Sequence, residues 1–306
     1  MTEPLFRDPA VQSRLDEDGF VLLPLLEQPQ IDDLLRFYRS VDRGDVESPP
    51  FHYSMDHPDS SYVEGVMEEV AGVLGEALDP HVVDTQIFTA SYVVKESNPR
   101  GVVPPHQDWS FVDESRYPST TVWTPLVDVD AENGALGVIH GSHRFFPGHI
   151  RASPSPQCRS VLSDHLFTLF PFVDIQPMRA GQALVFNNSL IHASPPNTSG
   201  APRVAAAVGI THRDADIRHH YLVPGSEPPE IEVYEADRDF FVRYGNDALS
   251  KLFAAGERPQ GRVIDRRPYR FDDVSREEML ALVARDPRNQ YKEELVETMK
   301  ALFGQQ

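Results

Sequence analysis

The middle of the chain alternates short β-prone runs with turn residues, and this pattern limits the possible folds more than any other feature. The runs beyond Pro80 are VVDTQIFTASYVVK, STTVWTPLVDV, ALGVIH, QALVFNN, LIHAS and RVAAAVGITH. Asn133-Gly134 and Ala180-Gly181 are tight-turn signals between them. Several short strands joined in this way favour a β-sandwich or a jelly roll over β-α-β units. We therefore expect a mainly β fold with flanking α-helices and a double-stranded β-helix core of cupin type.

Helical patterns lie on both sides of this region. Asp8 and Pro9 are typical of a helix start and Gly19 of a helix end. Apolar residues at helical spacing, or a capping-box pattern, mark the other helices. We expect helices at 9–19, from Pro29 to about Ser40, from Tyr62 to Leu78, after Ser275, and in the tail YKEELVETMKALF.

The 306 residues fit one domain with appended segments. We expect mainly helical support in residues 1–80 and the jelly-roll core in residues 81–215, with an insertion at about 151–176. Residues 216–306 would form a C-terminal extension that shapes the substrate site.

Composition limits the partners. Hydrophobic residues make up 40% and charged residues 25% of the chain, as in an ordinary globular protein. The net charge of −19, without a basic stretch, argues against nucleic acid. We also find no basic cluster for the phosphates of an acyl-CoA. The acidity gives a mild bias toward cationic or zwitterionic small molecules.

The cysteine content and the N-terminal residues bear on the cellular location. Cys158 is the single cysteine, so no intramolecular disulfide can form, which fits a reducing cytoplasm. The N-terminal residues are acidic where a secretory signal would be basic, and no early apolar run is long enough to cross a bilayer. We expect a cytoplasmic protein with no membrane partner. The oligomeric state stays open.

The segment PPHQDW contains the first candidate metal ligands. His106 and Asp108 are two residues apart in an extended stretch, so their side chains can project from the same face toward one ion. A lone His-x-Asp is a weak signal.

His192, in a later β-prone segment, completes a set of two imidazoles and one carboxylate. This set leaves three positions of an octahedron open, as in non-haem Fe(II) oxygenases. Zinc is the rival metal, although the helical HExxH spacing of many zinc enzymes is absent.

Two further residues favour Fe(II) with 2-oxoglutarate. Arg203 follows His192 on the next β-prone run, and its guanidinium could pair bidentately with the distal carboxylate of 2-oxoglutarate. Ser194 would project on the same face as His192 and could donate its hydroxyl to that carboxylate. The alternatives are a surface salt bridge for Arg203 and a turn role for Ser194.

At this point the sequence resembles the phytanoyl-CoA dioxygenase family of Fe(II)/2-oxoglutarate enzymes. The resemblance covers roughly residues 15–215. It rests on GFVLLPLL, HQD at 106–108, TVWTPLVDVDAENGALGVIHGSH at 121–143, and AGQALVFNNSLIHASPPNTSGAPR at 180–203.

The resemblance implies roles for particular residues. It places iron at His106, Asp108 and His192, with Arg203 and Ser194 on the distal carboxylate of the cosubstrate. It also implies that Trp123 lines the cosubstrate site and that Gln107 lies beside it. Core packing is the alternative for Trp123.

The chain departs from the family at His140, where a proline usually precedes the Gly-Ser-His turn. We expect structural roles for five further histidines, His143, His165, His212, His219 and His220. Asp113 and Glu114 follow the HQD segment and fit a solvated loop, with recognition of an amine substrate as the alternative.

The expected function is an Fe(II)- and 2-oxoglutarate-dependent dioxygenase. It would use O2 to hydroxylate or otherwise oxidise an unactivated C–H bond of a small metabolite, for example in secondary metabolism, and release succinate and CO2. The presence of Asp108 favours hydroxylation, because related halogenases carry a small residue there. The alternatives are a catalytically inactive jelly-roll binding protein and a cupin-type metalloenzyme independent of 2-oxoglutarate.

Overall fold

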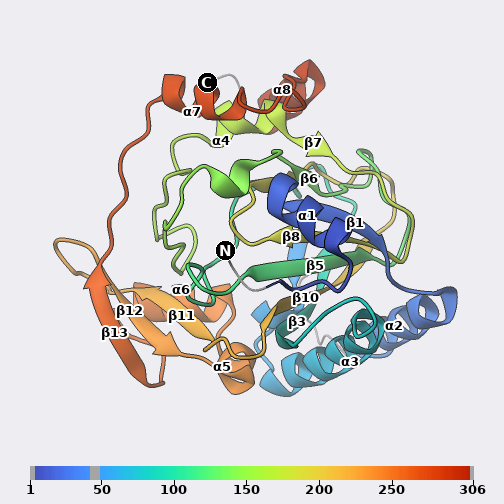
Figure 1. The fold of residues 1–306 in the computed structure, drawn as a ribbon, viewed down its shortest axis with the longest axis horizontal. Coiled ribbons are helices and arrows are strands. Elements are labelled where there is room, and N and C mark those ends of the chain that lie inside the picture. The colour runs from blue at the N-terminus through green and yellow to red at the C-terminus, as the bar shows by residue number, and fades with distance from the viewer. Residues whose placement is uncertain (1–3, 42–48, 304–306) are drawn as a thin grey trace.

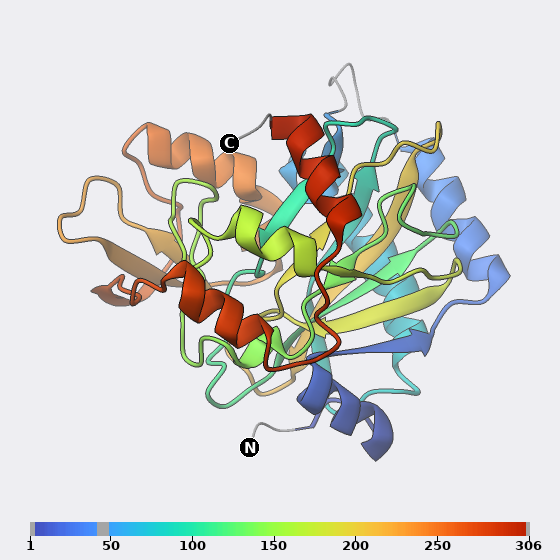
Figure 2. The ribbon, with the colours of Figure 1, turned by 90° about the horizontal axis from the view of Figure 1, so that it is seen from above.

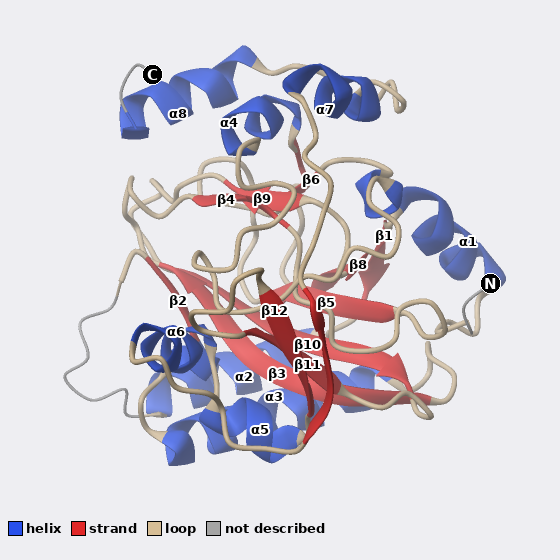
Figure 3. Ribbon diagram, turned by 90° about the vertical axis from the view of Figure 1, so that its left-hand side faces the viewer, coloured by secondary structure: helices blue, strands red, loops and turns tan. Residues whose placement is uncertain are grey.

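A computed structural model of the chain describes residues 4–41 and 49–303. β-Sheets occupy the centre of the molecule and helices lie on both sides of them (Figure 1). Figure 3 shows helices α2 (Gln28–Ser40), α3 (Ser60–Leu78) and α5 (Arg238–Arg243) on one side, and α4 (Leu166–Leu169), α7 (Arg276–Val283) and α8 (Glu293–Phe303) on the other. Seen from above, the two C-terminal helices, in red, lie on the side of the molecule nearest the viewer (Figure 2).

The N-terminal helices begin and end where their capping residues require. In α1 (Pro9–Asp18), the Asp8 side chain accepts a hydrogen bond from the Ala10 amide, and Gly19 ends the helix at φ 83°. Strand β1 (Phe20–Pro24) follows, and then α2 (Gln28–Ser40) and α3 (Ser60–Leu78). The three helices predicted in this region are confirmed.

The larger sheet is antiparallel and has the order β1-β8-β5-β10-β3-β2. Its remaining strands are β2 (Phe51–Tyr53), β3 (Thr85–Lys95), β5 (Ser119–Pro125), β8 (Gln182–Asn187) and β10 (Arg203–His212). Because β1 pairs with β8, the N-terminal region contributes a strand to the sheet as well as helices.

The smaller sheet, with the order β4-β9-β6-β7, packs against the larger one. Its strands are β4 (Val103–His106), β6 (Gly137–Val138), β7 (Asp174–Ile175) and β9 (His192–Ser194). Strand β7 comes from the end of the segment predicted as an insertion. The two sheets together form the jelly roll, and the predicted fold class is confirmed.

Side chains alternate between the two faces of β10. Val204 and Ala206 belong to the core shared with the helices, whereas Ala205 and Ala207 pack between the two sheets. The alternation of a β-strand therefore directs Arg203 into the space between the sheets. The sequence thus places a cation inside the jelly roll.

The C-terminal region forms a further sheet and the remaining helices. The sheet has the order β11-β12-β13, and these strands are Arg218–Leu222, Glu230–Glu235 and Val263–Pro268. The helices are α4 (Leu166–Leu169), α5 (Arg238–Arg243), α6 (Asn246–Ala254), α7 (Arg276–Val283) and α8 (Glu293–Phe303), with short 3-10 turns at Ser54–Asp56, Ser142–Arg144 and Phe170–Phe172. The helix predicted after Ser275 is α7, and a capping box of Ser275 and Glu278 opens it. Across residues 4–41 and 49–303, every helix is too short or too polar to traverse a bilayer.

Candidate metal centre

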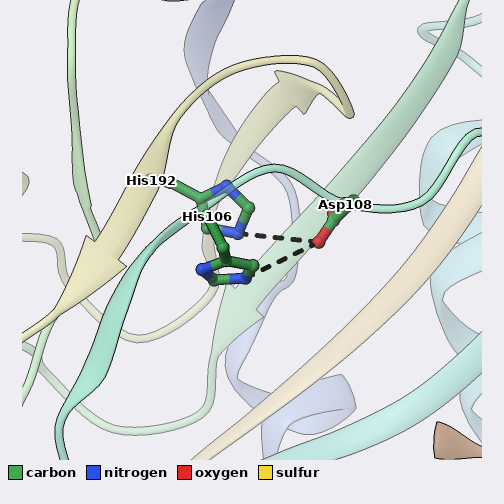
Figure 4. A group of neighbouring side chains, drawn as sticks. All are labelled: His106, Asp108 and His192. Carbon is green, nitrogen blue, oxygen red and sulfur yellow. Dashed lines mark ion pairs between the residues drawn. The ribbon is translucent and has the colours of Figure 1, made fainter. Parts of the chain in front are cut away.

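Two neighbouring strands of the smaller sheet position the histidines of the candidate centre. His106 ends β4, His192 begins β9, and the two residues are direct partners in the antiparallel register. Their ring centroids lie 4.1 Å apart. Asp108 lies in the loop just beyond β4 and turns its carboxylate toward both rings (Figure 4). The structure therefore brings together the three residues that the sequence predicts as metal ligands.

The donor atoms of these residues have the spacing that one metal ion needs. Asp108 Oδ1 lies 3.9 Å from His106 Nε2 and 3.7 Å from His192 Nε2, and all three donor atoms lie within 4.8 Å of one another. Three donors that each sit about 2.1 Å from a shared ion are separated by about 3 to 4 Å. The site therefore fits one divalent cation with only small side-chain adjustments.

Backbone carbonyls hold both rings with the metal-facing nitrogen free. His106 Nδ1 lies 2.9 Å from the Pro104 carbonyl, and His192 Nδ1 lies 3.0 Å from the Leu190 carbonyl. Because a carbonyl only accepts, each Nδ1 carries a proton and each Nε2 presents its lone pair. Partial burial, followed by the adjacent His192, lowers the pKa of His106 to about 4, so this ring is neutral at pH 7.

The carboxylate of Asp108 is also held from one side. The Thr121 hydroxyl, on β5, donates a hydrogen bond of 2.9 Å to Asp108 Oδ2. The other oxygen, Oδ1, is the one that faces the two imidazoles. Each of the three candidate ligands therefore has a second contact that fixes its orientation.

Arg203 lies inside the jelly roll with its charge uncompensated by protein. Its side chain is 1% exposed, and its Nε and Nη1 atoms have no hydrogen-bond partner in the described part of the chain. The guanidinium carbon sits 5.0 Å from the ring centroid of Trp123, which is itself buried. Burial lowers the pKa of Arg203 to about 9. A buried cation of this kind is suited to an anionic ligand.

Lys95 is a residue of this region that the sequence analysis missed. It is Arg203's register partner on β3, is fully buried, and donates from Nζ to Ser194 Oγ at 2.6 Å, to the Ser194 carbonyl at 3.2 Å and to the Pro195 carbonyl at 2.5 Å. Burial, and then the charge of Arg203, lower the pKa of Lys95 well below its ordinary value. The only sequence signal was a lysine at the end of an otherwise β-prone run.

Ser194 and Gln107 are already engaged with the protein. The Ser194 hydroxyl donates to the Gly134 carbonyl at 2.7 Å, so its proton points at the backbone in this structure. Gln107 Nε2 donates to the Ser189 carbonyl at 2.5 Å, while its Oε1 is buried without a partner among the described residues. Contacts of Ser194, Gln107 and Trp123 with a cosubstrate stay predictions.

His140, His143 and His165 make contacts with protein groups other than the three candidate ligands. Ring nitrogens of His143 and His165 lie 3.1 Å and 2.7 Å from the carbonyls of Asp16 and Val274. His140, at the position where the family usually has proline, lies 3.0 Å from the Asp174 carboxylate. Its backbone N–H and carbonyl are both bonded by the Asn289 side chain.

The fold and the site define a jelly roll with two histidines and one carboxylate arranged for a metal ion. The profile of the phytanoyl-CoA dioxygenase (PhyH) family matches residues 16–205. The chain therefore belongs to this family, and the resemblance stated from the sequence is confirmed.

The individual relatives match only part of the chain. The phytanoyl-CoA dioxygenase of Arabidopsis thaliana is 31% identical over 137 residues, which are 42% of this chain and 45% of that protein. The phytanoyl-CoA dioxygenase domain-containing protein 1 of Danio rerio is 30% identical over 128 residues, 40% of this chain and 43% of that protein. The chain thus spans less than half the length of these relatives.

Solved structures with a similar arrangement include HygX from Streptomyces hygroscopicus with nickel, 2-oxoglutarate and hygromycin B bound. It is 13% identical with a TM-score of 0.45, and the match covers 68% of this chain and 88% of HygX. The epimerase SnoN, in complex with Fe3+, alpha ketoglutarate and nogalamycin RO, is 19% identical with a TM-score of 0.48. That match covers 69% of this chain and 87% of SnoN.

Proposed function

We propose that this chain is an Fe(II)- and 2-oxoglutarate-dependent dioxygenase that oxidises an unactivated C–H bond of a small metabolite. One spatial relationship carries the proposal. The side chains of His106, Asp108 and His192 are arranged to bind a metal ion (Figure 4). The same jelly roll contains the buried guanidinium of Arg203, which has nitrogen atoms without a hydrogen-bond partner among the described residues. Membership of the phytanoyl-CoA dioxygenase family supports it.

Each candidate residue has a defined task in this proposal. His106, Asp108 and His192 would hold Fe(II), and Arg203 would bind the distal carboxylate of 2-oxoglutarate, with Trp123 beside it. Bound Fe(II) would supply the redox chemistry in which O2 and 2-oxoglutarate give succinate and CO2 while substrate is oxidised. The protein would position the reactants and exclude water from the space between the sheets.

The charge arrangement explains why a dicarboxylate is the expected cosubstrate. Lys95 and Arg203 are adjacent buried cations, and neither has an ion pair with a carboxylate in the part of the chain that the structure describes. A desolvated anion that enters this region would offset the cost of burying their charge. Hydroxylation is the favoured outcome because Asp108 retains the ligating carboxylate.

The proposal also includes the cellular location, the role of the C-terminal residues and the class of substrate. The buried, unpaired Cys158 supports a reducing, cytoplasmic location. Residues 216–306 would shape the substrate site as part of a single domain, and the substrate would be a small molecule of secondary metabolism.

An anaerobic titration tests this function. Adding Fe(II) and 2-oxoglutarate together should produce a weak visible charge-transfer band that neither component gives alone. His192→Ala should abolish the band, and Arg203→Ala should shift its formation to higher 2-oxoglutarate concentration. With O2 and a substrate panel, succinate should be released.

The alternatives predict different results. A cupin-type metalloenzyme independent of 2-oxoglutarate would bind the metal but give no band and would act without O2. An inactive binding protein would give no succinate with any substrate. If wild-type protein gives no band and no succinate, the proposed function is wrong.

A further inference from the structure

Arg151 forms a direct hydrogen bond to the backbone of a candidate metal ligand from a different part of the chain. Its Nε donates to the Asp108 carbonyl at 2.8 Å, although the residues are 43 positions apart. Its side chain is 6% exposed. Arg151 begins the segment predicted as an insertion, so this segment reaches back to the metal centre.

Glu114 anchors the other end of the guanidinium. Arg151 Nη1 donates to Glu114 Oε2 at 2.7 Å, and Nη2 donates to Oε1 at 2.5 Å, which makes a two-bond fork. Nη1 also lies 3.2 Å from the carbonyl of His149. Glu114 thus lies in a turn, as the predicted loop requires, but its partly exposed carboxylate is paired with Arg151.

Backbone bonds reinforce the same contact. The Ser110 amide donates to the Arg151 carbonyl at 3.0 Å, and the Arg151 amide donates to Ser110 Oγ at 3.2 Å. The Ser110 carbonyl in turn lies 2.8 Å from Nδ1 of His220, on β11. The loop that contains Asp108 is thus tied to both the predicted insertion and the C-terminal region.

We propose that Arg151 is a positioning residue for Asp108, so that it fixes the direction in which this carboxylate meets a metal ion. The inference rests on the proposed function, because it assumes that Asp108 is a metal ligand. Asp108 lies beyond the end of β4, where no strand pairing holds its peptide plane. The guanidinium fixes the Asp108 carbonyl, and Thr121 fixes one carboxylate oxygen. Together these contacts hold both the backbone carbonyl and the side-chain carboxylate of Asp108.

The direction in which metal affinity changes when Arg151 is replaced distinguishes a positioning role from a purely electrostatic one. Removing a positive charge near a cation site should strengthen metal binding if charge alone mattered. Loss of positioning should weaken it instead, by about 10- to 100-fold, as for other contacts that orient metal ligands. A weaker site in a variant that lacks this cation therefore cannot be a charge effect.

The test uses Mn(II) alone as the probe and the full chain freed of metal. The dissociation constant for Mn(II), measured from the free-ion EPR signal, should rise at least about 10-fold in Arg151→Met. Arg151→Lys should also weaken binding, because it keeps the charge but loses the planar fork that serves Asp108 and Glu114 together. Arg159→Met is the matched control, since Arg159 makes an exposed ion pair with Asp164 in the same segment. It should bind Mn(II) like wild type.

The outcomes distinguish this proposal from the function on which it rests. If Arg151→Met and Arg151→Lys bind Mn(II) as tightly as wild type, Arg151 is only a structural anchor and the proposal is wrong. If Arg151→Met does not fold, Arg151→Lys alone decides in the same way. If wild-type protein binds no Mn(II), the metal centre itself is wrong and the positioning role falls with it.

Discussion

The ammonium of Lys95 lies 2.6 Å from the hydroxyl oxygen of Ser194, across 99 positions of sequence. The same ammonium donates to the Ser194 and Pro195 carbonyls, so its three protons all have oxygen acceptors. The hydroxyl of Ser194 in turn donates a hydrogen bond to the Gly134 carbonyl. Lys95 therefore joins the end of β9 to β3 from inside the jelly roll.

Lys95→Met should destabilise the protein. The change leaves buried acceptors at Ser194 and Pro195 without donors, and each unsatisfied group costs about 1–3 kcal/mol. We expect the free energy of unfolding, measured with urea, to fall by about 2–4 kcal/mol. Lys251→Met, at an exposed position, is the control and should change it by less than about 0.5 kcal/mol. Equal stability of the two variants would show that the Lys95 contacts contribute nothing.

Arg203→Met should have the opposite effect on the ligand-free protein. Arg203 is buried without a carboxylate partner in the described residues, and its contact with Trp123 only partly offsets the desolvation of its charge. We expect the free energy of unfolding to rise by about 1–4 kcal/mol. Affinity for 2-oxoglutarate in the presence of Mn(II), measured by calorimetry, should fall by about 100-fold or more.

The role of Arg203 is tested by measuring both the change in stability and the change in 2-oxoglutarate affinity. A structural arginine would give lower stability and unchanged cosubstrate affinity when replaced. A ligand-binding arginine gives higher stability and lost affinity, because the fold bears the cost of a charge that only the ligand compensates.

The sequence allowed some features to be predicted because they depend on neighbouring residues. Asp8 and Gly19 define the ends of α1 through local capping and a left-handed turn. His106 and Asp108 project together because they are two residues apart at a strand end. His192 was harder to predict as a ligand, but its place in a β-prone run and its spacing to Arg203 indicated it.

Other features could not be predicted because they depend on how distant segments meet. Lys95 reads as an ordinary strand-end lysine until β3 and β10 pair and place it beside Arg203. Arg151 and Glu114 are 37 positions apart, and nothing local indicates their ion pair. Side-chain contacts of this kind arise from the tertiary fold, so a single sequence carries no signal for them.

Buried His219 should make the protein sensitive to acid. Burial, and then the charge of neighbouring His220, lower the pKa of His219 to about 3, below the ordinary value of 6.5. The unfolded chain therefore binds more protons than the folded chain between those values, so the stability present above pH 6.5 is lost as the pH falls toward 3. One such proton changes the free energy of unfolding by about 1.4 kcal/mol per pH unit.

A substitution isolates this contribution. Ser153 Oγ lies 2.7 Å from His219 Nε2 and 3.2 Å from the His220 carbonyl, and Nε2 is the donor in the tautomer that leaves the Ser153 hydroxyl bonded to that carbonyl. His219→Gln can keep that donor without titrating. Urea unfolding between pH 6 and pH 4 should show a slope that is shallower than in wild type by up to about 1.4 kcal/mol per pH unit. An unchanged slope would mean that His219 does not titrate on unfolding in this range.

Asn289 should couple the C-terminal segment to the turn that supports His192. Its side chain accepts from the His140 amide at 2.8 Å and donates to the His140 carbonyl at 3.1 Å and to the Val283 carbonyl at 3.0 Å. In the same turn, Ser142 Oγ accepts from the amide of Ile191, the residue before His192, at 2.8 Å. Asn289 is thus connected to His192 through the turn from His140 to Ser142 and the amide of Ile191.

Asn289→Ala leaves these backbone groups buried and unpaired, so the free energy of unfolding should fall by about 2–3 kcal/mol in a urea titration. Asn289→Asp keeps the acceptor for the His140 amide but loses both donated bonds, and a buried carboxylate adds a desolvation cost, so it should not recover wild-type stability. Gln290→Ala, one residue further along and exposed, should change stability by less than about 0.5 kcal/mol. Should Asn289→Ala match Gln290→Ala, the C-terminal segment does not brace the turn.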